Sequence, residues 1–495
     1  MRGMSTLPLN LYTAAQVREL DRRTIEDRGV PGYELMTRAG AFAAQAIDRH
    51  WPGRPLLVVC GAGNNAGDGY VVASRCLAAG GRAEVVALVD PAKLKGDAAK
   101  AWHDYLAAGG TVTPWAGELR PEPGAVIVDA LLGTGLDRDV DGEFARAVMA
   151  INASGHPVAA LDLPSGLHAD AGRVMGVAVR ADLTATFVGM KSGLLIGQGP
   201  DLAGALLYDD LGAPEDVFTG LTPAAVRLTG QDLARGLPTR PRDAHKGLLG
   251  HALIIGGRPG MPGAARLAGQ AALRAGAGLV TVATIDDHVP AIAAGCPELM
   301  CRGVSGPREL APLLERATVV AIGPGLARED WSRAVFDAAF DADTPLIVDA
   351  DGLNLLAEAP RTRSDWLLTP HPGEAARLLE CGTGDIQADR LDAYARLVER
   401  YQAAIVLKGA GSLVGGPGEP PRLCSFGNPG MAVAGMGDIL TGVVAGLAAQ
   451  LGDLPAAARL GVLAHALAGD DAARDGQRGL MATDLLNPLR RLLNP

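Results

Sequence analysis

Short apolar segments alternate with helical patterns along most of the chain. In the first half, apolar runs predict strands at Leu56–Cys60, Ala83–Val89, Ala125–Asp129 and Val158–Leu163. Apolar positions at helical spacing predict helices at Tyr70–Ala79 and Ala98–Ala108, and a helix pair within residues 14–50 that divides at Pro31-Gly32. Fully apolar strands that alternate with helices are typical of a parallel sheet covered by helices on both faces.

The alternation stops between about residues 212 and 244 and then resumes. This interval contains Gly212-Ala213-Pro214 and a second proline-rich stretch, so we place a linker there. A second series of apolar strands follows, at His251–Ile255, Val319–Ile322, Leu346–Val348, Trp366–Leu368 and Ala404–Leu407. Because the two halves share no order of motifs, they do not form an internal repeat. We therefore expect two different α/β domains, residues 1–215 and residues 225–495.

Composition and charge narrow the class of protein. The 495 residues are too many for one compact core, and the 48% of hydrophobic residues suffice for two buried sheets. A net charge of −10 without a basic tract argues against nucleic-acid binding. The six cysteines lack metal-binding spacing, no secretory pattern is visible, and no apolar run approaches the ~20 residues of a membrane span. We expect a soluble cytoplasmic protein that does not bind membranes.

The segment Gly61–Gly69 directly follows a predicted strand and directly precedes a helix. Its glycines let a ligand approach the backbone, and the start of a helix offers unpaired N–H groups to an anion. The alternative is a simple tight turn, but Asn64, Asn65 and Asp68 add polar groups that favour a ligand. The segment differs from the dinucleotide fingerprint, which reads G-x-G-x-x-G and has an acidic residue at the end of the next strand.

Two other predicted strands of the first half end in an aspartate. Asp129 precedes Gly133-Thr134-Gly135, and Asp162 precedes Leu163-Pro164-Ser165-Gly166. Ligands of parallel sheets gather at the C-terminal ends of strands, so we expect these ends to share one crevice with Gly61–Gly69. A single aspartate at a strand end is as readily a helix cap. Three glycine-flanked polar ends in succession favour a binding site.

Four segments of the first half together resemble the NAD(P)H-hydrate epimerases: Tyr12–Arg18, Asn64–Asp68, Val128–Ala130 with Gly133–Gly135, and Asp162–Gly166. The resemblance spans about residues 10–215 and implies a Rossmann-like three-layer sandwich. It implies substrate contacts from Asn64, Asn65, Ala66, Gly67, Asp68, Gly133, Thr134, Gly135, Leu136, Asp137, Arg138, Asp139 and Asp162. It also implies a potassium ion held by oxygens of Asn65, Asp129 and Ser165, which are hard ligands suited to such an ion.

Asp162 is the candidate acid/base of this domain. Interconversion of the R and S hydrates requires reversible loss of water or ring opening at the hydroxyl-bearing carbon, so a positioned proton donor and acceptor is needed. Lys95, one of six lysines in the chain, is a further candidate helper. The opposing hypothesis is that the first half is a catalytically idle binding or scaffolding module; the polar residues at its strand ends argue against it.

In the second half, Gly435-Met436-Gly437-Asp438 stands at the start of a predicted helix, Ile439–Gln450. Backbone N–H groups there form an anion pocket, and a carboxylate at its edge is useful if it takes a proton from a hydroxyl that attacks a phosphoryl group. The alternative is that Asp438 only caps the helix. Other loops at predicted strand ends favour a cleft: Lys408–Ser412, Gly323-Pro324-Gly325, Thr369–Glu374 and Asp349–Gly352, although Asp349 serves equally well as a cap.

These loops resemble the NAD(P)H-hydrate dehydratases of the ribokinase-like superfamily. The matching segments are His245–Gly247, Gly256-Gly257, Gly260–Ala265, Gly323–Leu326, His371–Glu374, Lys408-Gly409 and Asn428–Asp438. The resemblance implies hydrate contacts from Ala264, Gly325, His371 and Asp438, and nucleotide contacts from Lys408, Gly409, Ala410, Gly411, Ser412 and Gly437. ADP, or ATP as the alternative, would phosphorylate the hydrate's hydroxyl with Asp438 as base, and expulsion of phosphate would regenerate NADH or NADPH. Mg²⁺ is expected from the chemistry of phosphoryl transfer, with no assignable protein ligands.

The two resemblances predict a bifunctional enzyme, since a chiral dehydratase accepts one epimer and an epimerase supplies it from the other. The competing enzyme class is a small-molecule kinase for a vitamin precursor alcohol, fused to a ligand-binding domain. Stable phosphorylation of an alcohol would distinguish that kinase from a dehydratase. As partners we expect the small-molecule substrates, no nucleic acid, no membrane, and further copies of this chain in a homo-oligomer.

Overall fold

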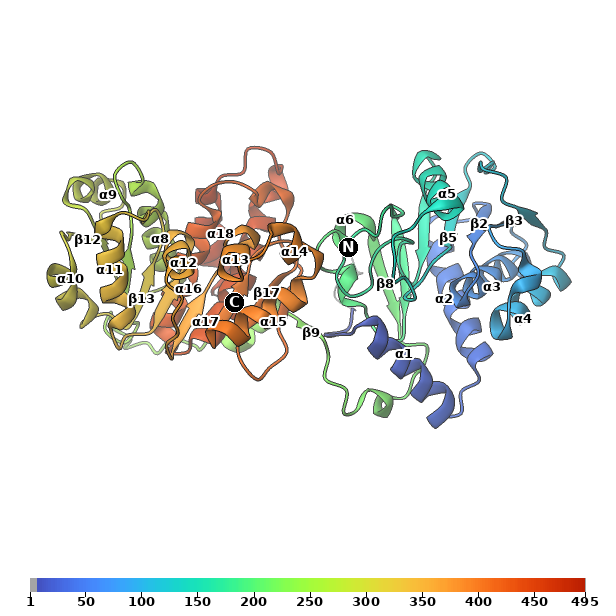
Figure 1. Ribbon diagram of the computed structural model, residues 1–495, viewed down its shortest axis with the longest axis horizontal. Helices are drawn as coiled ribbons and strands as arrows, with labels where there is room; N and C mark the ends of the chain where they lie inside the picture. Colours follow the sequence, from blue (N-terminus) through green and yellow to red (C-terminus); the bar gives the residue numbers. More distant parts are fainter. Residues whose placement is uncertain (1–6, 495) are drawn as a thin grey trace. The chain divides into compact units, whose positions relative to one another are not determined.

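The computed structural model describes residues 7–494 and divides into two compact units, one extending to Val226 and the other beginning at Arg227. Each unit has its own parallel sheet (Figure 1). Within residues 7–494, no helix is both long and apolar enough to cross a membrane.

The first unit is built on a seven-stranded parallel sheet in the order β4-β3-β2-β5-β6-β7-β8. Its strands are β2 (Leu56–Cys60), β3 (Ala83–Ala87), β4 (Val112–Pro114), β5 (Val126–Ala130), β6 (Val158–Leu161), β7 (Leu183–Phe187) and β8 (Ala205–Asp209). Its helices are α1 (Ala14–Arg22), α2 (Gly32–His50), α3 (Asn64–Ala78), α4 (Gly96–Ala107), α5 (Gly142–Ala153) and α6 (Gly199–Leu202). A short antiparallel pair joins β1 (Asn10–Leu11) to β9 (Ala225–Arg227).

Side chains of the first sheet alternate between its two faces, as the pleat of a strand requires. Val58 and Val128 pack with residues of α2, α3 and α4, whereas Val59 and Ile127 pack with residues of α5. All four side chains are fully buried. Both faces are therefore covered, which confirms the three-layer arrangement expected from the apolar strands.

The second unit has a sheet in the order β18-β17-β16-β15-β14-β13-β10-β11-β12, parallel except for the hairpin strands β17 and β18. Its strands are β10 (His251–Ile255), β11 (Leu279–Thr284), β12 (Met300–Gly303), β13 (Val319–Ile322), β14 (Leu346–Val348), β15 (Trp366–Leu368), β16 (Ala404–Leu407), β17 (Ser412–Gly415) and β18 (Arg422–Cys424). The helices α8 (Pro262–Ala275), α16 (Met436–Leu451), α17 (Leu454–Ala472) and α18 (Leu486–Leu492) share one core with the sheet.

The remaining helices of this unit are α7 (Gln231–Gly236), α9 (Val289–Gly295), α10 (Pro307–Leu314), α11 (Asp330–Asp341), α12 (Ala350–Glu358), α13 (Pro372–Leu378), α14 (Thr383–Ala388) and α15 (Arg390–Tyr401). In Figure 1, α11, α12 and α13 lie in front of the sheet and α16 and α17 behind it. Both faces of this sheet are thus covered as well.

The observed elements agree with the strands predicted from apolar runs, with one informative error. Helix α3 begins at Asn64 rather than Tyr70, so Asn64–Asp68 form its first turns instead of a loop. The prediction failed because asparagine, glycine and aspartate are weak helix formers, while tertiary packing against α2 and the sheet keeps this turn helical. The strands that were not predicted are β1, β4, β7, β8, β9, β11, β12, β17 and β18; in β7, for example, threonines interrupt the apolar run.

Helices α8 and α16 pack so closely that glycine is required at their contact. A Cβ atom on Gly442 would lie 2.0 Å from the backbone oxygen of Ala268, and one on Gly446 would lie 2.4 Å from that of Ala272. Backbone atoms move less easily than side-chain ends, so any larger residue must separate the helices.

We predict that Gly442→Ala lowers the free energy of unfolding of the second unit by about 1–3 kcal/mol, as expected for an overpacked contact. Urea titration followed by circular dichroism measures the change. The matched control is Gly263→Ala in α8, where a Cβ would have no neighbour within 4 Å. Equal stability of the Gly442→Ala protein and the wild type would contradict the prediction.

Candidate active sites

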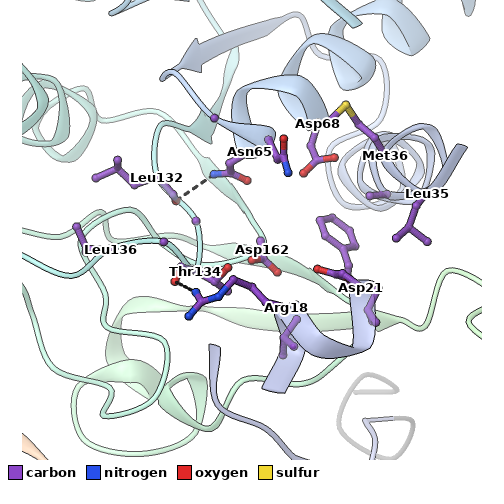
Figure 2. Close-up of a pocket in the computed structure, with 18 of the residues that line it drawn as sticks. Arg18, Asp21, Leu35, Met36, Asn65, Asp68, Leu132, Thr134, Leu136 and Asp162 are labelled. Atoms are coloured by element: carbon purple, nitrogen blue, oxygen red, sulfur yellow. Dashed lines mark hydrogen bonds between the residues drawn. The ribbon is translucent and has the colours of Figure 1, made fainter. Parts of the chain in front are cut away.

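A cavity of about 750 Å³ lies in the first unit, where β2, β5, β6 and β7 end (Figure 2). Its walls come from α1, α2, α3 and the loop that follows β5. Ten residues predicted from the sequence line it: Asn64, Asn65, Asp68, Gly133, Thr134, Gly135, Leu136, Asp137, Arg138 and Asp162. The structure therefore brings the three polar strand ends together in one crevice.

Other residues named from the sequence lie outside the cavity wall. Ala66 and Gly67 are buried, and a Cβ on Gly67 would lie 2.6 Å from the Met36 side chain, so this glycine permits α2 and α3 to pack. Asp139 is exposed. Lys95 is also exposed, at the start of α4, and does not belong to the described lining of the cavity.

The lysine that does reach the cavity is Lys191, which the sequence reasoning missed. Its side chain is 1% exposed and forms an ion pair with Asp162. Its ammonium also donates to Thr186 Oγ1 at 3.1 Å and to the Phe187 carbonyl at 2.9 Å. The sequence signal for Lys191 was that lysine is rare in this chain, but the residues next to it in the sequence do not predict that its side chain is buried.

The backbone is strained where β6 and β7 reach the cavity. Asp162 has φ = 66° and Val188 has φ = 57°, a left-handed conformation that is unusual for any residue with a Cβ and rare for a β-branched one. Such strain persists only where the surrounding fold enforces it, and it concentrates at functional sites. The tight turn at Asp162 directs its carboxylate into the cavity, as Figure 2 shows.

Two further carboxyl groups face this cavity, from Asp21 on α1 and Asp68 on α3 (Figure 2). Burial raises the pKa of Asp21 to about 6, with Lys191 opposing and Asp162 adding to the shift. Burial, followed by the charges of Asp162 and Asp21, raises the pKa of Asp68 well above its ordinary value. Asp21 was not predicted, because on the sequence it is one charge among several on an amphipathic helix.

Beside the cavity, Asn65, Asp129 and Ser165 form a cluster of oxygens around the Leu132 backbone. Asn65 Nδ2 donates to the Leu132 carbonyl at 3.0 Å, and Ser165 Oγ accepts from the Leu132 N–H at 2.8 Å. Ser165 Oγ also lies 2.6 Å from Asp129 Oδ1. Asn65 Oδ1 is buried without a hydrogen-bond partner among the described residues. Burial raises the pKa of Asp129 to about 6, against hydrogen bonds from Ser165 and Leu131.

In the second unit, Asp349 is the residue around which the polar groups gather. It directly follows β14 and is 1% exposed. Lys408 Nζ lies 2.7 Å from its carboxylate, and the hydroxyls of Thr369 and Thr441 donate to it at 2.8 and 2.7 Å. Its side chain does not cap α12, so the capping alternative is wrong for Asp349.

The charges in this network favour the ionised pair. Burial acts to raise the pKa of Asp349, but the Lys408 ammonium and three hydrogen bonds outweigh it and hold that pKa below its ordinary value. Burial acts to lower the pKa of Lys408, but Asp349 and Glu374 outweigh it and raise that pKa. Lys408 is therefore a fixed positive charge at the ends of β14 and β16.

Asp438 lies in the first turn of α16 and is not a member of the Asp349–Lys408 pair. Within residues 7–494 its carboxylate accepts no hydrogen bond, and Gly435 occupies the N-cap position, so Asp438 is not the cap of α16. Burial, and then the negative charge of Asp349, raise the pKa of Asp438 to about 7, against the opposing effect of Lys408. A carboxyl with that pKa gains or loses a proton readily near neutral pH.

The remaining predicted positions surround these groups. A Cβ on Gly437 would lie 3.6 Å from Lys408 Nζ, and one on Gly325 would lie 3.1 Å from the Ala264 side chain. His371 is half-exposed and caps α13 by accepting from the N–H groups of Gly373 and Glu374. Burial, then Lys408, lowers the pKa of His371.

Arg390 supports the loop Lys408–Ser412 through hydrogen bonds, and the sequence did not predict this residue. Arg390 is 1% exposed, and its guanidinium donates to the carbonyls of Leu407, Lys408 and Gly411 at 3.2–3.4 Å. Ser412 Oγ closes the loop by donating to the Gly409 carbonyl at 3.0 Å. Gly409 and Ala410 remain exposed at its tip, where a ligand can reach their backbone.

Comparison with known proteins gives a family match for each unit. A family model described as NAD(P)H-hydrate dehydratase matches residues 252–491, and one described as YjeF-related protein N-terminus matches residues 32–193. The second unit is similar to the crystal structure of the ADP/ATP-dependent NAD(P)H-hydrate dehydratase from Bacillus subtilis, with 31% identity and a TM-score of 0.50. That match covers 54% of this chain and 97% of the bacterial one.

Two relatives match almost the whole chain. The bifunctional NAD(P)H-hydrate repair enzyme of Coxiella burnetii is 46% identical over 98% of this chain and 99% of its own length. That of Escherichia coli is 40% identical over 99% of this chain and 95% of its own length. On these matches, the chain belongs to the family of bifunctional NAD(P)H-hydrate repair enzymes.

Proposed function

We propose that the chain repairs hydrated NADH and NADPH. The first unit interconverts the R and S hydrates, and the second dehydrates the S form at the expense of ADP. The observation that carries the proposal is the pair of polar sites, one in each unit. Each has a lysine against an aspartate that follows a strand, and a second carboxyl of raised pKa. A binding module requires no such proton-exchanging groups.

In the first unit, the hydrate occupies the cavity between the first turns of α3 and Gly133–Arg138. Asn64 and Asn65 at the start of α3 line the cavity, and the unpaired backbone N–H groups of a helix start suit the pyrophosphate. Asp162 contacts the substrate, and Lys191 holds it in place.

The oxygens beside this cavity fit a potassium ion. Asn65 Oδ1 is a buried acceptor without a partner among the described residues, and Asp129 is a buried carboxylate without a cation. Hard oxygen ligands of this kind suit a large monovalent cation. Asn65, Asp129 and Ser165 would hold the ion, which would neutralise Asp129 and fix the turn that begins α3.

In the second unit, Lys408–Ser412 and Gly437 bind the nucleotide's phosphates. Asp438 takes the proton from the hydrate's hydroxyl as that oxygen attacks the phosphoryl group. The C–O bond to phosphate then breaks, the adjacent ring carbon loses a proton to the departing phosphate, and the ring double bond forms. Mg²⁺, when bound with the nucleotide, neutralises phosphate charge. Lys408 adds a fixed positive charge, and its hydrogen bond to Asp349 keeps the ammonium close to the turn at Gly437.

The direct test follows absorbance of the reduced nicotinamide with mixed-epimer NADH hydrate, Mg²⁺, and either ADP or ATP. We expect recovery of all the hydrate, with ADP the better nucleotide. Recovery of only the S fraction, after correction for spontaneous epimerisation, would contradict the epimerase assignment. Stable phosphorylation of an alcohol without NADH formation would favour the kinase alternative.

We predict that Asp438→Asn slows dehydration of pure S hydrate by ~10²-fold or more, because a general base of this kind contributes ~10²–10⁴-fold. Epimerisation by the first unit should be unchanged. In the wild type, kcat/KM for dehydration should fall as pH drops below about 7, since the base must be ionised. A flat profile between pH 5 and 8 would count against Asp438 as the base.

Thermal unfolding is the control for this variant. The pKa of Asp438 rises from 3.8 to about 7 on folding, so its ionisation destabilises the folded state, and wild-type stability falls as pH rises through that interval. Asp438→Asn abolishes this loss, so at pH 8 the variant should melt no lower than the wild type. Lower melting would mean that the activity loss is structural.

We predict that K⁺ raises the melting temperature of the first unit relative to tetramethylammonium at equal ionic strength, because binding to the folded state alone stabilises it. Asp129→Asn should remove the K⁺-specific increase. Scanning calorimetry of the full chain measures both effects. An equal melting temperature in the two salts would argue against a bound potassium ion.

A further inference from the structure

The cavity of the first unit holds more negative charge than its buried cation can balance. Asp21, Asp68 and Asp162 point into it from α1, α3 and the end of β6 (Figure 2). Lys191 is the buried cation among the described lining residues. The other charged side chains of the lining are Arg18, Asp97, Asp137 and Arg138.

Among these three carboxylates, Lys191 forms an ion pair with Asp162 alone. An ammonium has three N–H groups. Those of Lys191 donate to Asp162 Oδ1, Thr186 Oγ1 and the Phe187 carbonyl, so none remains for Asp21 or Asp68. Arg18 is exposed and donates to the Thr134 carbonyl at 3.3 Å. Asp162 is thus held in an ion pair, and a carboxylate paired with a buried ammonium is a poor candidate for repeated gain and loss of a proton.

Asp21 and Asp68 are in the opposite situation. Within residues 7–494 neither carboxyl accepts a hydrogen bond or forms an ion pair, although both face the cavity. Burial raises the pKa of each, and the anions of Asp162 and Asp21 raise that of Asp68 further. The Lys191 charge opposes both shifts, but like charges in one cavity disfavour the ionisation of both carboxyls at once. Asp68 is the one affected by both neighbouring anions.

We propose that Asp68 is the proton donor and acceptor of the epimerase, that Asp21 is a positioning residue that keeps the proton on Asp68, and that Asp162 is a fixed anion that orients the substrate. The inference rests on the proposed epimerase function and deepens it. It transfers the acid/base role from Asp162, where the sequence places it, to a carboxyl that is free to exchange its proton.

The chemistry requires one group that alternates between acid and base. Water added across the enamine of a dihydronicotinamide leaves a hydroxyl on the carbon bonded to the ring nitrogen. Asp68 gives its proton to that hydroxyl, the C–O bond breaks, and the nitrogen lone pair forms a C=N bond as water leaves. Water then adds to the other face of this iminium carbon, the nitrogen recovers its lone pair, and the surplus proton returns to the Asp68 carboxylate.

The test uses the full-length chain and pure R hydrate, with S hydrate separated by chromatography and the spontaneous rate subtracted. Asp68→Asn should slow epimerisation by ~10²-fold or more. ADP-dependent dehydration of pure S hydrate by the second unit should be unchanged in the same preparation. The control Asp201→Asn removes an exposed carboxyl on α6, outside the lining of the cavity, and should match the wild type.

Asp21→Asn provides a second, independent readout. Removing this anion lowers the pKa of Asp68, because the Asp21 charge is one of the causes that raise it. The alkaline limb of the pH profile for epimerisation should therefore move to lower pH. A purely structural role of Asp21 would lower the rate at every pH without moving the limb.

The outcomes separate this inference from the function on which it depends. A wild type that epimerises no faster than the spontaneous reaction would overturn the epimerase assignment itself. An active wild type with an Asp68→Asn variant within about threefold of its rate would overturn this inference alone. Replacement of an unpaired buried carboxyl by a neutral amide should not destabilise the fold, so the Asp68→Asn variant should melt no lower than the wild type.

Discussion

Both sites depend on the same interaction, a lysine ammonium held against an aspartate that follows a parallel strand. In the first unit Lys191 holds Asp162, which follows β6; in the second, Lys408 holds Asp349, which follows β14. A buried charge is tolerated only when it is paired and its hydrogen bonds are satisfied, and here hydroxyls or carbonyls satisfy the rest. Each pair consequently holds an aspartate and a lysine in fixed positions at its site.

The pairing has a chemical consequence for the carboxyls left outside it. Asp68 and Asp438 lie close to the pairs but lack partners of their own, so burial and the neighbouring anions raise the pKa of each. Two kinds of carboxyl result in each unit: one is paired with a lysine and positions other groups, and the other exchanges a proton. This division arises from environment alone, because all four residues are aspartates.

The folds explain why such groups meet. In both sheets the strands that carry the site residues are parallel neighbours, β2-β5-β6-β7 in one and β13-β14-β15-β16 in the other. Their C-terminal ends therefore lie along one edge, where glycine-rich turns and helix starts leave backbone groups available to phosphates. Tight packing of α16 on α8 through Gly442 then fixes the helix that carries Asp438.

The sequence by itself determined the two α/β domains, many of the strands and the loops of both sites, because apolar runs and glycine-flanked polar ends are local signals. It also led to the family, through motifs contiguous in the chain. It could not find Asp21, Lys191 or Arg390, and it left open whether Asp349 was only a cap. These residues acquire their roles from burial and from partners elsewhere in the chain; Thr441, for example, lies 92 residues beyond Asp349. Only the tertiary structure decided which carboxylates are paired, because the pairing depends on distances in space rather than on spacing along the sequence.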